Sequence, residues 1–192
     1  MLESALGAGR AWTGGVAMSR RTLAGWSSTE RRSPAGAVEF EQLVTSTRPL
    51  VAYSEAGARE LAERYWREVE TATRRLVRAR HREGAVALLL FGRWTLLRFE
   101  APRTVVDESG VLTSFAITGG LLVRTPGGSI TFSQSAQPRV QLRATIDGFF
   151  PRLGRRQEGP AWTGGLYRHV QQRIHTAISR RYFARLIDEE AA

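Results

Sequence analysis

The sequence predicts an α+β domain in which a curved antiparallel sheet of six to seven strands packs against a long C-terminal helix, with a second helix before the sheet. Three observations support this fold class. Short apolar segments follow one another between residues 85 and 150, and turn sequences separate them. One amphipathic segment precedes this run at residues 56–82, and another follows it at residues 163–187.

Composition and charge limit the classes of protein that this chain can be. With 192 residues, 42% hydrophobic and 24% charged, the chain can bury a sizeable core. It contains no cysteine, which excludes disulfides, thiol nucleophiles and thiolate metal sites. The formal charge is +10, and all 28 basic residues are arginine, so anionic partners are favoured. A GC-rich coding sequence would also produce this arginine bias.

Residues 1–36 are predicted to be a disordered basic tail, and residues 37–192 a single domain. The tail is rich in Gly, Ala, Ser, Thr and Arg, and no helical or strand period persists in it. Ser19-Arg20-Arg21 is similar to the start of a twin-arginine export signal, but the apolar core that should follow is missing. We therefore expect a cytoplasmic protein. Met1 and Met18 are both candidates for the first residue.

The first amphipathic segment predicts a helix over Ala56–Arg82, with Ser54 as its N-cap and Gly84 as its end. Arg48–Tyr53, just before it, is predicted to be a short edge strand. Arginines fill the last turns, Arg74–Arg82. They fit either a solvated face near the negative end of the helix dipole or a contact for phosphate or anionic lipid.

The strands are predicted from alternation and from turn residues. In the last strand, Val140, Leu142, Ala144 and Ile146 should point inward. Gly119-Gly120 interrupts a strand and indicates strong curvature. The turns are expected at Gly92-Arg93, Asp107–Gly110 and Pro126–Gly128, the last of which should join Leu121–Thr125 to Ser129–Ser135 as a hairpin.

The closing helix is expected to begin at Thr163 and to cover the sheet. Its apolar stripe is Tyr167, Val170, Ile174, Ile178, Tyr182 and Leu186.

The order of elements over Arg48–Ile187 resembles the START/SRPBCC, or helix-grip, superfamily, in which a curved antiparallel sheet wraps a long C-terminal helix. The local likeness is to an uncharacterised bacterial subgroup, through the hairpin Val105–Gly110 and the helix Gln172–Leu186. One long helix stands where that superfamily has two short ones, and the link Phe149–Trp162 is longer. The resemblance implies a cavity between sheet and helix that binds an apolar or amphipathic small molecule.

No pattern in the sequence predicts a reaction. His169 and His175 are six residues apart and point in different directions on a helix, and no metal-binding spacing occurs, so we expect neither a metal nor another cofactor. Gly-x-Ser-x-Gly is absent, and neither Gly-Gly pair opens a helix, so no phosphate loop is indicated. Whether the protein is an enzyme stays open, with binding the favoured alternative.

Two functions from different classes follow as hypotheses. The first is binding of a hydrophobic or amphipathic small molecule in a cavity between the sheet and the C-terminal helix, lined by Phe115, Phe132, Leu142, Ile146, Tyr167 and Ile174. The second is electrostatic binding of nucleic acid or an anionic membrane surface through clustered arginines, with anion contacts at Arg152, Arg155 and Arg156. The oligomeric state is not predicted.

Overall fold

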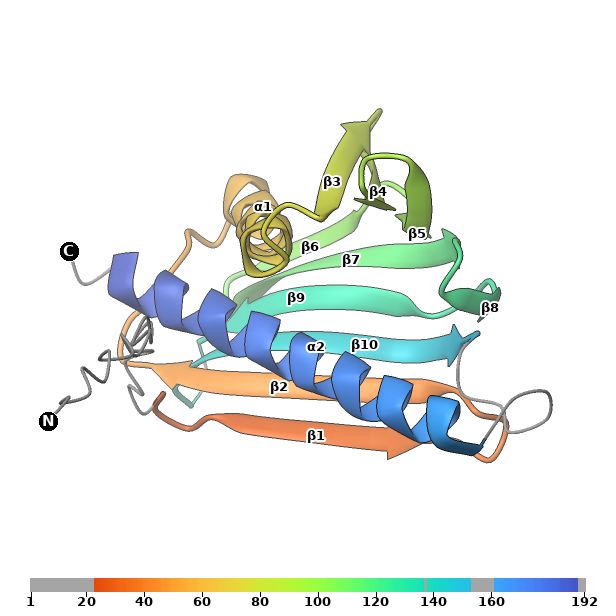
Figure 1. Ribbon diagram of the computed structural model, residues 1–192. Coiled ribbons are helices and arrows are strands. Elements are labelled where there is room, and N and C mark those ends of the chain that lie inside the picture. Colours follow the sequence, from red (N-terminus) through yellow and green to blue (C-terminus); the bar gives the residue numbers. More distant parts are fainter. Residues whose placement is uncertain (1–22, 137, 153–160, 190–192) are drawn as a thin grey trace, which may run out of the picture.

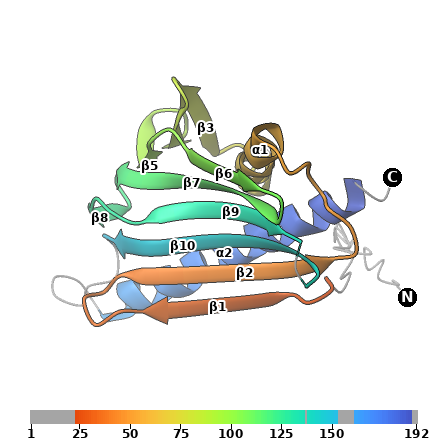
Figure 2. The same cartoon turned by 180° about the vertical axis from the view of Figure 1, so that it is seen from behind.

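The computed structural model describes residues 23–136, 138–152 and 161–189, with the side chains of residues 175–189 in the last range. These residues form an α+β fold with ten antiparallel strands and two helices. Both helices lie on the same face of the sheet (Figures 1 and 2). The elements are β1 (Ser27–Arg32), β2 (Val38–Ser46), α1 (Glu55–Ala72), β3 (Val77–Arg82), β4 (Ala85–Leu90), β5 (Trp94–Phe99), β6 (Arg103–Asp107), β7 (Gly110–Gly119), β8 (Val123–Thr125), β9 (Ser129–Ser135), β10 (Val140–Pro151) and α2 (Ala161–Glu189).

The strand order is β1-β2-β10-β9-β7-β5-β4-β3, with β6 paired to β7 and β8 paired to β10. The α+β class is therefore confirmed, but the prediction of six to seven strands is wrong. The three strands that were missed all lie before residue 85. β1 is polar on both faces and β3 is rich in arginine, so neither shows the apolar alternation of a half-buried strand.

The predicted N-terminal tail extends too far into the chain. Residues 27–32 pair with β2 as β1, and Leu23 is buried. Residues 1–22 lie outside the described residues.

The predicted strand Arg48–Tyr53 is also wrong, because the amides of Leu50 and Val51 donate to the Oε1 atom of buried Gln134 at 2.7 and 3.1 Å. The side chain of Gln134 thus accepts the backbone hydrogen bonds that a neighbouring strand would otherwise accept.

The first helix ends ten residues earlier than predicted. Its start is confirmed, because the hydroxyl of Ser54 accepts a hydrogen bond from the amide of Gly57 at 3.2 Å. Near its end, the hydroxyls of Thr71 and Thr73 donate to backbone carbonyls one turn back. Arg74 and Arg75 then adopt left-handed φ angles of 52° and 61°, and β3 follows. The arginines at positions 78, 80 and 82 alternate with the two-residue period of a strand. The helix prediction assigned them to the polar face of a helix and so missed this period.

The strands from β4 onward follow the predicted order, and one predicted hairpin is wrong. The turn at Asp107 is confirmed, since its Oδ1 accepts hydrogen bonds from the amide and hydroxyl of Ser109 at 2.8 and 2.6 Å. The inward residues of β10 are buried or half-buried, as predicted. However, β8 pairs with the end of β10 and not with β9. β9 already has β7 and β10 as neighbours, so neither of its edges is free.

Aromatic rings join both helices to the sheet. Tyr65 of α1 lies 4.7 Å from Phe132 of β9 and 5.4 Å from Tyr182 of α2, measured between ring centroids. Trp66 lies 5.2 Å from Phe99 of β5. The described half of α2 buries the predicted stripe residues Ile178, Tyr182 and Leu186, together with Phe183. The C-terminal half of α2 and the centre of α1 therefore share one packed core.

Candidate functional site

The residues predicted to line a ligand cavity occupy different environments. Phe115, Phe132 and Leu142 are 4%, 0% and 1% exposed, and Ile146 is half-buried. The ring of Phe132 is enclosed by Tyr65, Trp66 and Tyr182. The side chains of Tyr167 and Ile174 lie outside the described residues. A cavity between the sheet and the first half of α2 stays a prediction, because that wall is not described.

The structure places a groove beside the other helix, α1. Its volume is about 490 Å³, and residues of strands β3, β4, β6 and β7 line it opposite the helix. The groove has an apolar wall and a charged rim. The apolar residues include Ala62, Trp66, Val86 and Phe115, and the charged and polar ones include Arg59, Glu63 and His81. Phe115 is thus the predicted lining residue that borders this groove.

Trp66 is one of the residues that line this groove. Its side chain is 3% exposed, and its ring lies 5.6 Å from that of Phe115 in an edge-on arrangement. The indole Nε1–H is buried and has no hydrogen-bond partner among the described residues. A buried indole N–H normally has an acceptor, because leaving it without one costs free energy. Neighbouring atoms cover this nitrogen, so a ligand atom or a water molecule would satisfy it only after a local rearrangement.

A second pocket continues the groove toward the C-terminal half of α1. Its volume is about 340 Å³, and it shares Glu63, Trp66 and His81 with the first. Arg67 and Glu70 of α1 also line it. The shared residues make the two pockets neighbours along one side of the helix.

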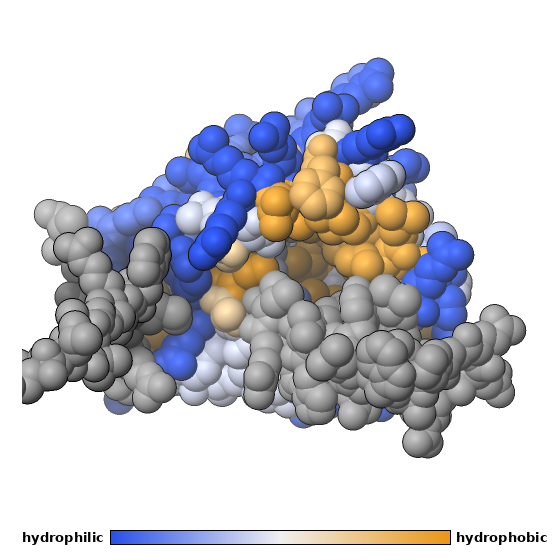
Figure 3. All heavy atoms as spheres, in the orientation of Figure 1, coloured by the Kyte–Doolittle hydropathy of each residue, from blue (hydrophilic) through white to orange (hydrophobic). Residues whose placement is uncertain are grey.

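Hydrophobic side chains also reach the surface near the end of β4 and the start of β5. In Figure 3 they gather over these strands and surround a hollow above the sheet. The exposed residues in this region are Leu76, Phe91, Trp94 and Leu121, each at least 50% exposed. This surface lies apart from the polar rim of the α1 groove.

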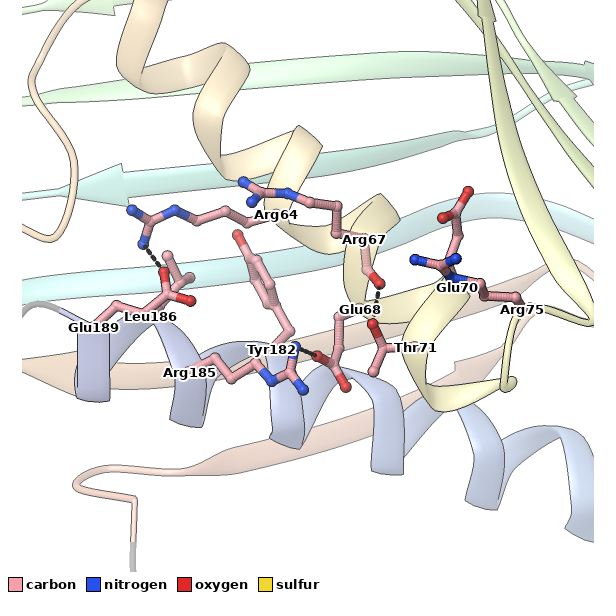
Figure 4. Close-up of a pocket in the computed structure, with 10 residues that line it drawn as sticks. All are labelled: Arg64, Arg67, Glu68, Glu70, Thr71, Arg75, Tyr182, Arg185, Leu186 and Glu189. Atoms are coloured by element: carbon pink, nitrogen blue, oxygen red, sulfur yellow. Dashed lines mark hydrogen bonds and ion pairs between the residues drawn. The ribbon is translucent and has the colours of Figure 1, made fainter.

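The third pocket, of about 200 Å³, lies between α1 and α2 and is lined by four arginines and three glutamates (Figure 4). Most of these charges are paired. The Nη1 atom of Arg64 lies 3.1 Å from the carboxylate of Glu189. Arg67 and Arg75 form no ion pair with any residue that the structure describes. The pocket therefore holds two arginines that an added anion can reach.

Glu68 is the buried carboxylate of this pocket. Its side chain is 2% exposed and lies 2.6 Å from Nε of Arg181 and 3.1 Å from Nη1 of Arg185. Both arginines come from α2, whereas Glu68 comes from α1. The three side chains therefore link the two helices, and we assign them a structural role.

His175, Tyr65 and Tyr182 have displaced pKa values in the core, whereas in the exposed turn at Asp107 hydrogen bonds from Ser109 lower the pKa of the carboxyl group. Burial lowers the pKa of His175 to about 4, and its ring stacks on Phe40 at 5.1 Å. Burial raises the pKa of Tyr65, and a hydrogen bond with Ser179 opposes this shift. Burial also raises the pKa of Tyr182, whose hydroxyl donates to the carbonyl of Leu61. Among the described residues there is no group of three or more His, Asp and Glu side chains that could hold a metal ion.

Of the predicted anion contacts, Arg152 is exposed and directly follows β10. Arg155 and Arg156 lie outside the described residues. Sequence reasoning did not find the α1 groove, because its walls come from α1 and four separate strands. An unpartnered donor such as the indole of Trp66 is visible only in three dimensions.

Within the described ranges, no helix is long and apolar enough to cross a membrane. Comparison of the chain with models of protein families, with curated proteins and with solved structures found no match. The resemblance to the START/SRPBCC superfamily therefore stays a prediction.

Proposed function

We propose that this chain binds an amphipathic small molecule in the groove between α1 and strands β3, β4, β6 and β7. The observation that carries the proposal is this groove itself, bordered by Trp66, whose buried indole N–H has no partner among the described residues. The volume of about 490 Å³ is typical of small-molecule pockets. An apolar wall with a few polar groups is also usual for such sites.

The lining indicates the chemistry of the ligand. Trp66 requires a hydrogen-bond acceptor, while Val86 and Phe115 favour an apolar body. Arg59 at the rim and Arg67 in the adjoining pocket form no ion pair with a described residue, and neither do Glu55 and Glu63 of the same rim, so a charged group of either sign on the ligand would find a partner there. The proposed ligand is therefore an apolar molecule that carries a charged group.

The first test is mass spectrometry of an extract of the natively purified protein, in search of a bound ligand. The second is titration with a fluorescent anilinonaphthalene sulfonate dye, which combines an apolar body with an anionic group. Thr104 is exposed and lines the groove, so Thr104→Trp should fill it and remove the dye binding that belongs to the groove, while dye bound at the exposed rings of Phe91 and Trp94 should remain. Thr125→Trp, at an exposed position on β8, is the control and should bind like the wild type.

The variant Trp66→Phe tests the indole N–H directly. It keeps the aromatic packing and removes one hydrogen bond, so affinity should fall about tenfold, or about 1.4 kcal/mol. Equal dye affinity in the wild type, Thr104→Trp and Trp66→Phe would contradict the proposal.

A further inference from the structure

Four exposed apolar side chains adjoin one another at one corner of the molecule, which we call the apolar corner: Leu76, Phe91, Trp94 and Leu121. The amide of Phe91 donates to the carbonyl of Leu76 at 2.7 Å. The rings of Phe91 and Trp94 lie 6.1 Å apart, and the amide of Leu121 donates to the carbonyl of Thr95, the residue after Trp94. The hydrophobic surface over β4 and β5 is visible in Figure 3.

The backbone of Phe91 makes this corner unusual. Phe91 has a φ of 52° and Gly92 a φ of 68°, in the turn between β4 and β5. Turns of this kind favour Asn, Asp or Gly at the first position, because a bulky side chain is strained in the left-handed region. Yet the ring of Phe91 is 62% exposed, so burial within the chain does not compensate for the strain. Strain without internal compensation points to a contact outside the chain.

The charges around the apolar corner have one sign. Residues 73–98 contain seven arginines and a single acidic residue, Glu83. Arg74 and Arg75 directly precede Leu76, and Arg93 directly precedes Trp94. All three are exposed. Glu83 lies at the opposite end of β4, in the turn from β3. Arginine remains charged at any working pH and forms paired hydrogen bonds with phosphate and carboxylate groups.

We propose that the apolar corner docks on the surface of a lipid bilayer that contains anionic lipids. Phe91 and Trp94 would enter the headgroup region, where amphipathic aromatic rings are favoured, and Leu76 and Leu121 would follow them. Arg74, Arg75 and Arg93 would contact lipid phosphates and carboxylates. The aliphatic members favour a bilayer over nucleic acid, because leucine offers a base neither a hydrogen bond nor a flat ring to stack on.

The test is co-sedimentation of the full chain with vesicles, of phosphatidylcholine alone or mixed with phosphatidylserine. We expect binding only to the mixed vesicles, with affinity that falls steeply as salt is added. Phe91→Asn removes the ring and places a residue that tolerates the left-handed backbone. It should weaken vesicle binding about tenfold, or about 1.4 kcal/mol, and should leave the midpoint of thermal unfolding unchanged or raise it.

Matched variants separate the apolar corner from general charge and hydrophobicity. Val105→Asn removes an apolar side chain that is 57% exposed on β6, and it should not weaken binding. Arg74→Gln with Arg93→Gln should reduce both binding and its salt dependence, whereas Arg103→Gln with Arg143→Gln, on β6 and β10, should have little effect.

Three results would overturn the proposal. The first is no co-sedimentation with phosphatidylserine vesicles at low salt. The second is equal binding of Phe91→Asn and Val105→Asn. The third is binding of single-stranded RNA that is tighter than vesicle binding and depends on Arg74 and Arg93, which would assign the apolar corner to nucleic acid instead.

Discussion

His175 is a residue whose protonation should differ between the folded and the unfolded chain. Its ring stacks on Phe40, and its Nδ1 lies 3.3 Å from Nε2 of Gln42. The amide nitrogen of Gln42 can only donate, so this contact requires an unprotonated Nδ1. Nε2 of His175 is buried and has no partner among the described residues. The site therefore favours the neutral ring, in agreement with its lowered pKa.

The stability of the protein should fall in acid because of His175. Its pKa is about 4 in the folded chain against 6.5 for the unperturbed group. Between these values the unfolded chain binds a proton that the folded chain does not, so lowering the pH through this window favours unfolding. The full effect is about 3 kcal/mol. Urea unfolding at several pH values would measure it, and His175→Gln should show a flatter profile; equal slopes would contradict this prediction.

At the scale of elements, one buried carboxylate links α1 to α2, beside the contact of Tyr65 with Tyr182 and the ion pair of Arg64 with Glu189. Glu68 is 2% exposed, whereas Arg181 and Arg185 are 40% and 51% exposed. If Glu68 is removed, both arginines can turn into water, and a half-exposed ion pair is worth little. If both arginines are removed, the carboxylate stays buried without a charged partner.

Substitutions on the two helices should therefore have unequal costs. We expect Glu68→Gln to lower the free energy of unfolding by about 1–2 kcal/mol. Arg181→Gln combined with Arg185→Gln should lower it by about 3–5 kcal/mol. Arg180→Gln, at an exposed position on the same helix, should change it by less than about 0.5 kcal/mol. Chemical denaturation measures all three, and equal costs for the first two changes would exclude this account.

At the scale of the whole molecule, the sheet has open edges. β3 ends the strand order, so its outer edge is a template for pairing with another chain, although the amide of Ala79 on β3 already donates to Oε1 of Glu70 at 2.8 Å. Arg78, Arg80 and Arg82 are exposed along it. Charged side chains on an edge strand oppose such pairing, because it would bring like charges together.

Removing charges from this edge should promote aggregation. We expect Arg80→Val with Arg82→Val to raise the rate of aggregation several-fold, as measured by light scattering on warming. Arg143→Val is the control, because β10 is paired on both sides by β2 and β9. A rise of the same size in the control would mean that net charge, and not the edge, limits aggregation.

The sequence alone determined the features that depend on near neighbours in the chain. The N-cap at Ser54 and the turn at Asp107 each need only residues two or three positions away. The alternation along β10 follows from its own pattern of apolar residues. The end of α1 was placed ten residues too late, because the arginines of β3 continue the polar face of the helix and conceal a change of period.

Only the tertiary structure decided which strands pair and where a ligand can bind. β8 joins β10 because β9 has no free edge, and this is a property of the whole sheet. Three ion pairs join α1 to α2, and the two partners of each pair are separated by more than a hundred positions in the chain. Whether an apolar side chain lines a cavity depends on whether other side chains pack over it, and the sequence does not give that packing. Trp66 is buried, and its indole N–H lacks a hydrogen-bond partner among the described residues, because of contacts with residues that are distant in the sequence. The residues next to Trp66 in the chain do not indicate these contacts.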